Sequence, residues 1–197
     1  MRHKNGLAVA GVVGLAATVI AVPASGADDS VRVIDDVAEA LSLPQSASDA
    51  PPEPVRLDEL GDIIPDSVRL VESDEIGSYW IGQTSSDDIC LFVHIPGGVE
   101  VAASACASLP QFYQSGLGLT ASEGDDDPYR AVEAYLVPDN VDVQEFSIGE
   151  EPLGPAAESR IANLIIVPPE HRGTLESTDL PLDSGELFSF TPIPREG

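Results

Sequence analysis

Few side chains in this sequence have the type and spacing for chemistry, and His94 is the first candidate. It lies in the apolar run Ile89–Ile95, where strict alternation places it on one face with Cys90 and Phe92. A hydrolytic site would need a serine and an acidic residue brought to His94 from elsewhere in the chain. Serines are plentiful but no GxSxG elbow is present, so we expect His94 to serve packing and predict no catalytic residue. His171 is expected in a solvated surface loop.

The two cysteines, Cys90 and Cys106, have 15 residues between them. A hairpin that turns at Gly97 and Gly98 would bring Cys106 within a residue or two of facing Cys90, close enough for a bond. In an exported chain such a pair is most simply a disulfide. A redox pair is the alternative, although the CxxC spacing that lowers a thiol pKa is missing.

Metal and cofactor sites are not predicted. Two cysteines cannot close a structural zinc site, and the histidines lack ligand spacing. The acidic stretch 123–127 offers carboxylates to calcium but lacks the alternating ligands of an EF-hand, so a solvated turn is preferred. The glycines of 116–121 lack the third glycine of a dinucleotide fingerprint and are interpreted as a helix stop and a strand entry. An aromatic platform for a sugar or peptide would draw on Tyr79, Trp80, Tyr129 and Tyr135, of which at least half should be core.

The N-terminus has the layout of a signal peptide over residues 1–27. Arg2, His3 and Lys4 precede the uncharged apolar run Leu7–Val22, and small residues follow it up to Ala27. The run is shorter than the ~20 residues that span a bilayer, which favours cleavage after Ala27 over an uncleaved membrane anchor. Both alternatives place the rest of the chain outside the cytoplasm, secreted or on the outer face of the membrane.

The charge of the chain limits its partners. The full sequence has a formal net charge of −25, and loss of Arg2 and Lys4 with the leader leaves 7 basic against 34 acidic residues, a net of −27. Such a field repels nucleic acid and anionic membranes. We therefore expect no nucleic acid partner, and contact with a membrane only through an uncleaved N-terminal segment.

The remaining chain is predicted to be one domain with flanking tethers. Residues 28–54 are acidic and rich in proline and serine, which indicates a linker, with a possible short helix after Ser30. The globular domain is expected over 55–191, with one or two helical turns over 55–63, and residues 192–197 form a tail.

The spacing of strand-like runs predicts the fold class: mainly β (α+β), an antiparallel meander or small sandwich of about 7–10 strands with one or two short helices. One helix is expected near Leu109, Phe112 and Tyr113, whose spacing places them on one face. A last hairpin is expected to join 174–178 to 186–191. The expected strands are Val68–Glu72, Tyr79–Gln83, Ile89–Ile95, Val99–Ala105, Leu117–Ser122, Val132–Val137, Val141–Ile148 and Ile161–Val167.

Several short motifs resemble a group of exported actinobacterial proteins of unknown function. They are Pro65–Leu70, Tyr79–Gly82, Ile89–Leu91, Ser104–Cys106 and Tyr135–Asp139, within roughly residues 55 to 148. The resemblance implies export, a small β-rich domain and a paired cysteine. It implies no activity.

Together these patterns favour a non-catalytic exported binding or envelope-associated module with an unknown ligand. The alternative is a secreted hydrolase that uses His94 with a serine and an acidic partner. A weaker alternative is a calcium-dependent adhesion module that uses the acidic stretch 123–127.

Overall fold

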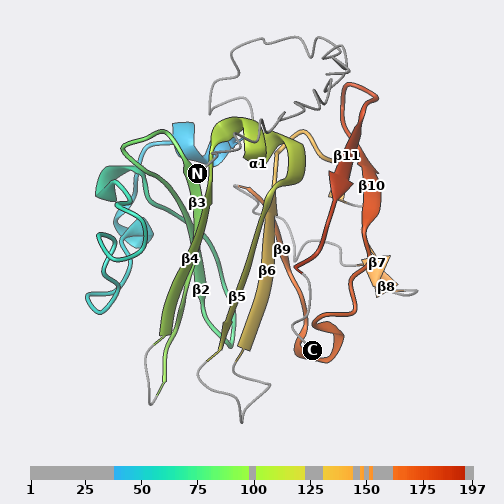
Figure 1. The fold of residues 1–197 in the computed structure, drawn as a ribbon. Coiled ribbons are helices and arrows are strands. Elements are labelled where there is room, and N and C mark those ends of the chain that lie inside the picture. Colours follow the sequence, from blue (N-terminus) through green and yellow to red (C-terminus); the bar gives the residue numbers. More distant parts are fainter. Residues whose placement is uncertain are drawn as a thin grey trace, which may run out of the picture. The chain divides into compact units, whose positions relative to one another are not determined.

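The structure is a computed structural model that describes residues 38–97, 101–122, 131–143, 147–148, 151–152 and 162–193 (Figure 1). The chain divides into two units, Met1–Val31 and Arg32–Gly197, and every described residue belongs to the second. The expected signal peptide, 1–27, lies outside the described residues. Within them the fold is mainly β, with antiparallel sheets and one α-helix, as the strand spacing predicted.

The first sheet is an antiparallel meander whose strands lie in chain order. Every residue of its third strand is buried, which fits a strand with neighbours on both sides and apolar side chains on both faces. This confirms the interpretation of 89–95 as a central strand. The strands are β1 (Arg69–Ser73), β2 (Ser78–Gln83), β3 (Ile89–Ile95) and β4 (Val101–Ala107).

The second sheet has the order β5-β6-β9, with β5 at Leu117–Ser122, β6 at Ala131–Val137 and β9 at Asn163–Ile166. Helix α1 (Leu109–Ser115) confirms the helix predicted near Leu109, Phe112 and Tyr113, and it links the first sheet to the second. It stops at Gly116, which has φ 65° and ψ −161°, and a Cβ there would lie 2.7 Å from a carbonyl oxygen of β6. Only glycine fits such a junction without strain. Among the described residues no helix is long and apolar enough to cross a membrane.

Two short hairpins complete the described strands. The last one pairs β10 (Thr178–Pro181) with β11 (Leu187–Phe190) through a turn that contains Gly185 at φ 84°. The other pairs β7 (Ser147–Ile148) with β8 (Glu151–Pro152).

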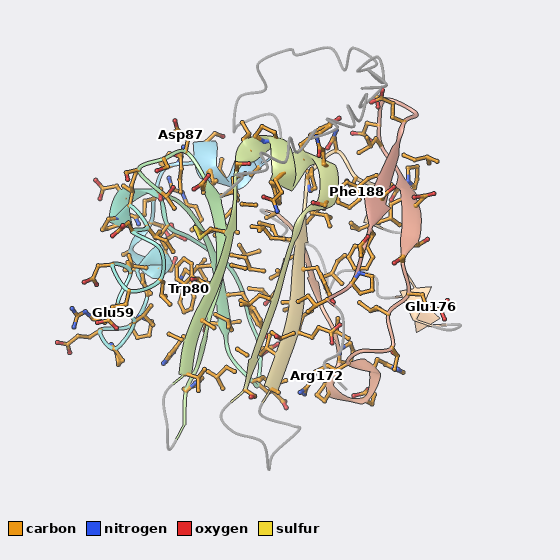
Figure 2. All side chains as sticks on the ribbon, in the orientation of Figure 1. Glu59, Trp80, Asp87, Arg172, Glu176 and Phe188 are labelled. Atoms are coloured by element: carbon orange, nitrogen blue, oxygen red, sulfur yellow. A yellow bond between two sulfur atoms is a disulfide. The ribbon has the colours of Figure 1, made fainter. Side chains whose placement is uncertain are left out.

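Three apolar clusters hold these elements together as layers (Figures 1 and 2). The main core lies between the two sheets and includes Tyr79, Leu91 and Phe112. A second cluster joins the second sheet to the β10–β11 hairpin and includes Phe188. The third covers the other face of the first sheet around Trp80. The first and second sheets are thus each covered on both faces, although antiparallel sheets often leave one face to solvent.

Two strand predictions differ from the structure by more than two residues. Residues 141–148 do not form one strand: Val141 makes an isolated bridge to Leu182, 142–143 lie outside any strand, and 147–148 pair with β8, while 144–146 lie outside the described residues. The first strand of the last hairpin is not 174–178 but β10, four residues later, because the pairing with β11 is set by the turn at 183–185. Turn geometry fixes register in a hairpin.

The segment expected to be a linker is packed on the domain from Ala38 onward. Ala38 and Ala40 belong to the main core, and the Arg69 guanidinium donates to the Leu43 carbonyl. Asp49 in the 3-10 helix 47–49 is buried and bonds the first sheet through the Leu70 N–H. Residues 38–54 therefore contact the domain that was predicted to begin at 55, through two alanines and through polar contacts of single residues.

The expected helix after Ser30 lies mostly outside the described residues. A 3-10 helix, Glu39–Ser42, stands where its C-terminal end was predicted. The expected tail, 192–197, begins inside the fold, because the Ile193 N–H donates to the Tyr135 hydroxyl.

Candidate binding site

The outer face of the first sheet carries a flat aromatic surface that is covered by residues 55–65, here called the cover segment. Trp80 on β2 and Phe92 on β3 face each other in register and stack with ring centroids 5.4 Å apart and an interplanar angle of 8°. Stacked aromatic pairs add about 0.5–1.5 kcal/mol beyond the area they bury. The predicted one or two helical turns of 55–63 are instead irregular turns, because their apolar side chains lie against this face.

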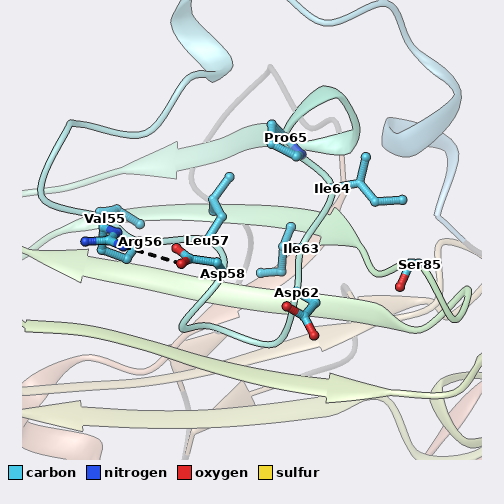
Figure 3. Close-up of a pocket in the computed structure, with 9 residues that line it drawn as sticks. All are labelled: Val55, Arg56, Leu57, Asp58, Asp62, Ile63, Ile64, Pro65 and Ser85. Carbon is cyan, nitrogen blue, oxygen red and sulfur yellow. Dashed lines mark hydrogen bonds and ion pairs between the residues drawn. The ribbon is translucent and has the colours of Figure 1, made fainter.

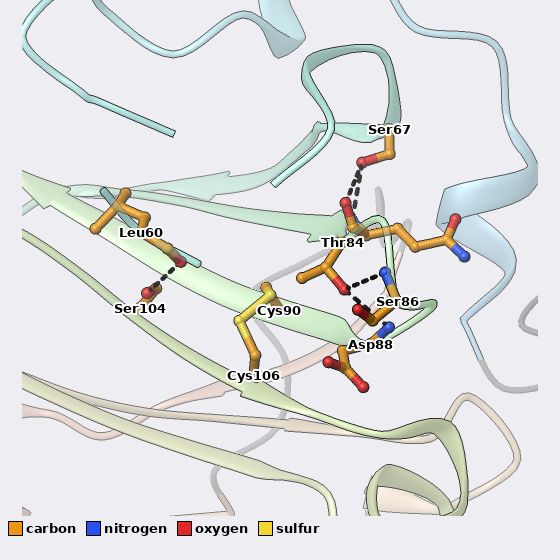
Figure 4. The surroundings of a disulfide bond; sticks show 9 residues. Leu60, Ser67, Thr84, Ser86, Asp88, Cys90, Ser104 and Cys106 are labelled. Carbon is orange, nitrogen blue, oxygen red and sulfur yellow. Dashed lines mark hydrogen bonds between the residues drawn. A yellow bond between two sulfur atoms is a disulfide. The ribbon is translucent and has the colours of Figure 1, made fainter. Parts of the chain in front are cut away.

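The disulfide lies on the same face (Figure 4). Cys90 and Cys106 are opposite each other in the β3–β4 register, with Cα atoms 4.1 Å apart, and their sulfur atoms are bonded. This confirms the predicted pairing. The described residues contain no free cysteine, because both are in this bond.

Three local contacts fix the cover segment to the sheet. The Ser104 hydroxyl of β4 donates to the Leu60 carbonyl at 2.7 Å (Figure 4). Gly61, at φ 111°, passes so close to the disulfide that a Cβ on it would lie 3.2 Å from the Cys106 Sγ. Ile63 fills the space above Gly82, where a Cβ would meet its Cγ2 at 2.7 Å. Glycine is needed at both places for close approach.

An open cleft of about 660 Å³ runs along the cover segment (Figure 3). Its apolar lining comes from branched aliphatic side chains and Pro65, and among these Ile64 is 39% exposed. A volume of this size falls in the range of ligand clefts, roughly 300–1,000 Å³. The lining residues run in Figure 3 from the Arg56 end to Ser85 at the other: Val55, Arg56, Leu57, Asp58, Asp62, Ile63, Ile64, Pro65 and Ser85.

The charges of the cleft are one cation and two carboxylates. Arg56 donates to Asp58 at 3.4 Å and lies 3.8 Å from Glu59, and the hydrogen bond to Asp58 raises the pKa of the guanidinium. All three of these side chains are more than 60% exposed, so the ion pairs contribute little to stability. Asp62 makes no ion pair with any residue that the structure describes. The cleft is thus apolar along its floor and net negative at its rim.

His94 is buried on the face predicted by alternation, with 7% of its surface exposed. It stands opposite Ser78 of β2 and Ala102 of β4. The Ser78 hydroxyl is bonded to Ser73, and the His94 Nε2 has no hydrogen-bond partner among the described residues. A general base must reach its nucleophile within about 2.6–3.2 Å. The described residues therefore assemble no triad around this ring.

The described members of the predicted aromatic platform lie apart from one another. Tyr79 lies in the main core, Trp80 under the cover segment and Tyr135 against the last hairpin, while Tyr129 falls outside the described residues. Burial, and then Asp74, raises the pKa of Tyr79, whose hydroxyl donates to that carboxylate at 3.0 Å. Burial also raises the pKa of Tyr135 against the opposing bond from the Ile193 N–H. Both phenols therefore stay protonated and act as structural donors.

The remaining predicted positions lie apart from the cleft. His171 ends a 3-10 helix in the predicted loop and is partly exposed, and the Gly173 N–H of the same turn donates to buried Glu133 at 2.7 Å. The stretch 116–121 is the helix stop and strand entry that was expected. The acidic stretch 123–127 lies outside the described residues, and among described ranges no cluster of three or more His, Cys, Asp or Glu could hold a metal ion.

Sequence reasoning missed the cleft, although one signal was available. Apolar residues recur at Val55, Leu57, Leu60 and Ile63 among polar and charged ones, which indicates a segment that packs one side on a surface. Comparison with protein-family models, with curated proteins and with solved structures finds no match to this chain.

Proposed function

We propose that this protein is a non-catalytic, extracytoplasmic binding module whose ligand site is the cleft in the cover segment. The observation that supports the proposal most directly is the cleft itself, which has a volume of about 660 Å³, is lined mainly by apolar side chains, and is open to solvent yet anchored on a disulfide-linked sheet. Binding sites are commonly built on segments positioned by a rigid scaffold.

The location outside the cytoplasm rests on the disulfide and on the leader-like residues 1–27. Disulfides form and persist in oxidising compartments and are rare in the cytosol. Secretion or attachment to the outer face of the membrane remains part of the proposal.

A fragment screen by NMR tests the binding site. We expect fragments with an apolar body to shift the backbone amide signals of ¹⁵N-labelled protein around Leu57, Ile63 and Ile64. Leu57→Ser should weaken these shifts, while Leu187→Ser, a matched loss of an exposed leucine on β11, should not. Fragments that bind elsewhere, or nowhere, would contradict the assignment of the cleft.

The hydrolase alternative makes a separate prediction at His94. If the module is non-catalytic, ester, peptide and glycoside screens show no turnover, and His94→Gln costs at most about 0.5–3 kcal/mol of unfolding free energy. A hydrolase would show turnover that falls by at least ~10²-fold in His94→Gln. Reproducible turnover with that loss would make the enzyme class the better account.

A further inference from the structure

The geometry points to a basic polypeptide segment as the occupant of the cleft: an extended stretch of a partner chain in which a lysine or arginine stands between apolar side chains. This inference rests on the proposed function, because it names the chemical class of ligand for the same site. It is carried by the shape of the cleft, its apolar lining and the sign of its charge.

The apolar lining requires an apolar part in the ligand. Leu57 and Ile63 lie along the cleft between its two ends, and Ile64 leaves 39% of its surface to solvent (Figure 3). Removing apolar surface from water is favourable, and the gain grows with the area that the ligand covers. A purely hydrophilic ligand would leave this surface unused.

The charge requires a cation. Arg56 is already paired with Asp58 and lies near Glu59, so an incoming anion would have to compete with two carboxylates for one guanidinium. Asp62 has no cationic partner in the described part of the chain, and it stands at the rim with φ 55° directly after Gly61. The chain as a whole has a formal net charge of −25, which also attracts cations and repels anions.

The open form of the cleft favours a chain segment over a free amine. Small-molecule sites bury about 70–90% of their ligand, which an open cleft along one surface segment does not do. A polypeptide can lie along such a cleft and extend past both ends. Alternate side chains of an extended segment then meet the apolar floor and the acidic rim.

Fluorescence anisotropy with labelled pentapeptides tests the inference on the full chain. The probes are capped Leu-Lys-Leu-Lys-Leu, its Gln and Glu counterparts, and hexylamine as an unlabelled competitor. We expect the Lys peptide to bind most tightly, with an affinity that falls as salt rises because the rim charges are exposed. Hexylamine should compete only at far higher concentration.

Two charge variants should act in opposite directions. Asp62→Asn keeps the shape of the side chain and tolerates a left-handed backbone, and we expect it to weaken the Lys peptide about 2–5-fold. Arg56→Gln removes the competing cation and should tighten binding by roughly the same order. Glu176→Gln is the matched control, because it removes one exposed carboxylate far from Glu59 and the cleft (Figure 2).

The outcomes separate this inference from the proposed function. If Asp62→Asn and Glu176→Gln weaken the Lys peptide equally, the peptide is attracted by the overall charge only, and the inference that it binds in the cleft is wrong. Tighter binding of the Glu peptide, with weakening in Arg56→Gln, would overturn the ligand class. If hexylamine competes at the same concentration as the Lys peptide, the inference that the ligand is a polypeptide is wrong. In each of these cases the fragment screen by NMR decides separately on the proposed function. If fragments still shift the amide signal of Leu57, the proposal of a binding module holds; if no fragment shifts it, that proposal is also wrong.

Discussion

At the scale of single residues, Asp49 shows how much one buried carboxylate contributes to this fold. Its Oδ2 accepts the Ser46 N–H at 2.5 Å and its Oδ1 accepts the Leu70 N–H at 3.0 Å, so both oxygens are in use. Burial alone raises the pKa of Asp49, but these N–H groups, with the Ser46 hydroxyl and the nearby Arg69, outweigh it and lower the pKa below its ordinary value. The carboxylate thus caps a 3-10 turn and joins it to β1.

Asp49→Asn is expected to lower the free energy of unfolding by about 1–3 kcal/mol at pH 7, because an amide NH₂ would face one of the two N–H donors. Since the folded pKa is lowered, the contribution of Asp49 is fully present above the unfolded value and is lost as pH falls through the folded value. Urea unfolding from pH 7 downward should show the gap between wild type and variant narrowing only at acid pH. Glu53 carries an exposed carboxylate nearby in the sequence, so Glu53→Gln should leave the free energy of unfolding unchanged. An equal loss in Glu53→Gln would contradict the role assigned to Asp49.

At the scale of elements, the junction of α1 and β5 depends on Gly116. We expect Gly116→Ala to destabilise the protein by more than the roughly 1–3 kcal/mol of backbone strain alone, because its Cβ would also lie 2.7 Å from the Leu136 carbonyl oxygen. Gly185 isolates the two contributions: it has φ 84°, but a Cβ on it would have no atom within 4 Å, so Gly185→Ala should cost strain only. Thermal unfolding of the two variants compares their losses of stability. Equal losses would contradict the prediction, because they would mean that the Leu136 carbonyl moves away from the new Cβ at little cost.

The disulfide between β3 and β4 is expected to contribute to the stability of the protein. Replacing Cys90 and Cys106 together by alanine is expected to cost about 3 kcal/mol, the chain-entropy value for a loop of this length. Non-reduced mass spectrometry of the native protein should find no free thiol, and unfolding in urea gives the energy. Two alkylatable cysteines in freshly isolated protein would contradict the pairing.

The elements that were predicted correctly are those whose contacts come from a periodic pattern of their own side chains. β3 and β5 were found with correct ends because their own side chains face the core and turn residues bound them. The packing of 38–54 was not found, because it rests on two alanines, one carboxylate and backbone carbonyls, none of which forms a periodic pattern. The cleft was missed for a related reason. Its apolar residues pack on the face of the first sheet around Trp80, and they belong to no helix or strand whose periodicity could have revealed them.

At the scale of the whole molecule, the packed N-terminal segment predicts where the domain can be cut. A chain that begins at Val55 loses Ala38 and Ala40 from the core and the bonds made by Leu43, Gln45 and Asp49. We expect it to be less stable by at least ~3 kcal/mol than a chain that begins at Arg32, out of a typical total of about 5–15. Calorimetry of both chains decides; equal stability would restore the linker interpretation.

The meander order of the first sheet also sets the order in which the protein can assemble. Each of β2, β3 and β4 pairs with the strand made just before it, so this sheet needs no residue beyond Ala107 and only short loops to close. Local pairings of this kind form quickly. The second sheet must wait for β9, and its outer face for the last hairpin. A chain delivered from its N-terminus can therefore complete its cleft-bearing half, and oxidise its cysteines, while nearly half of its residues are still to come.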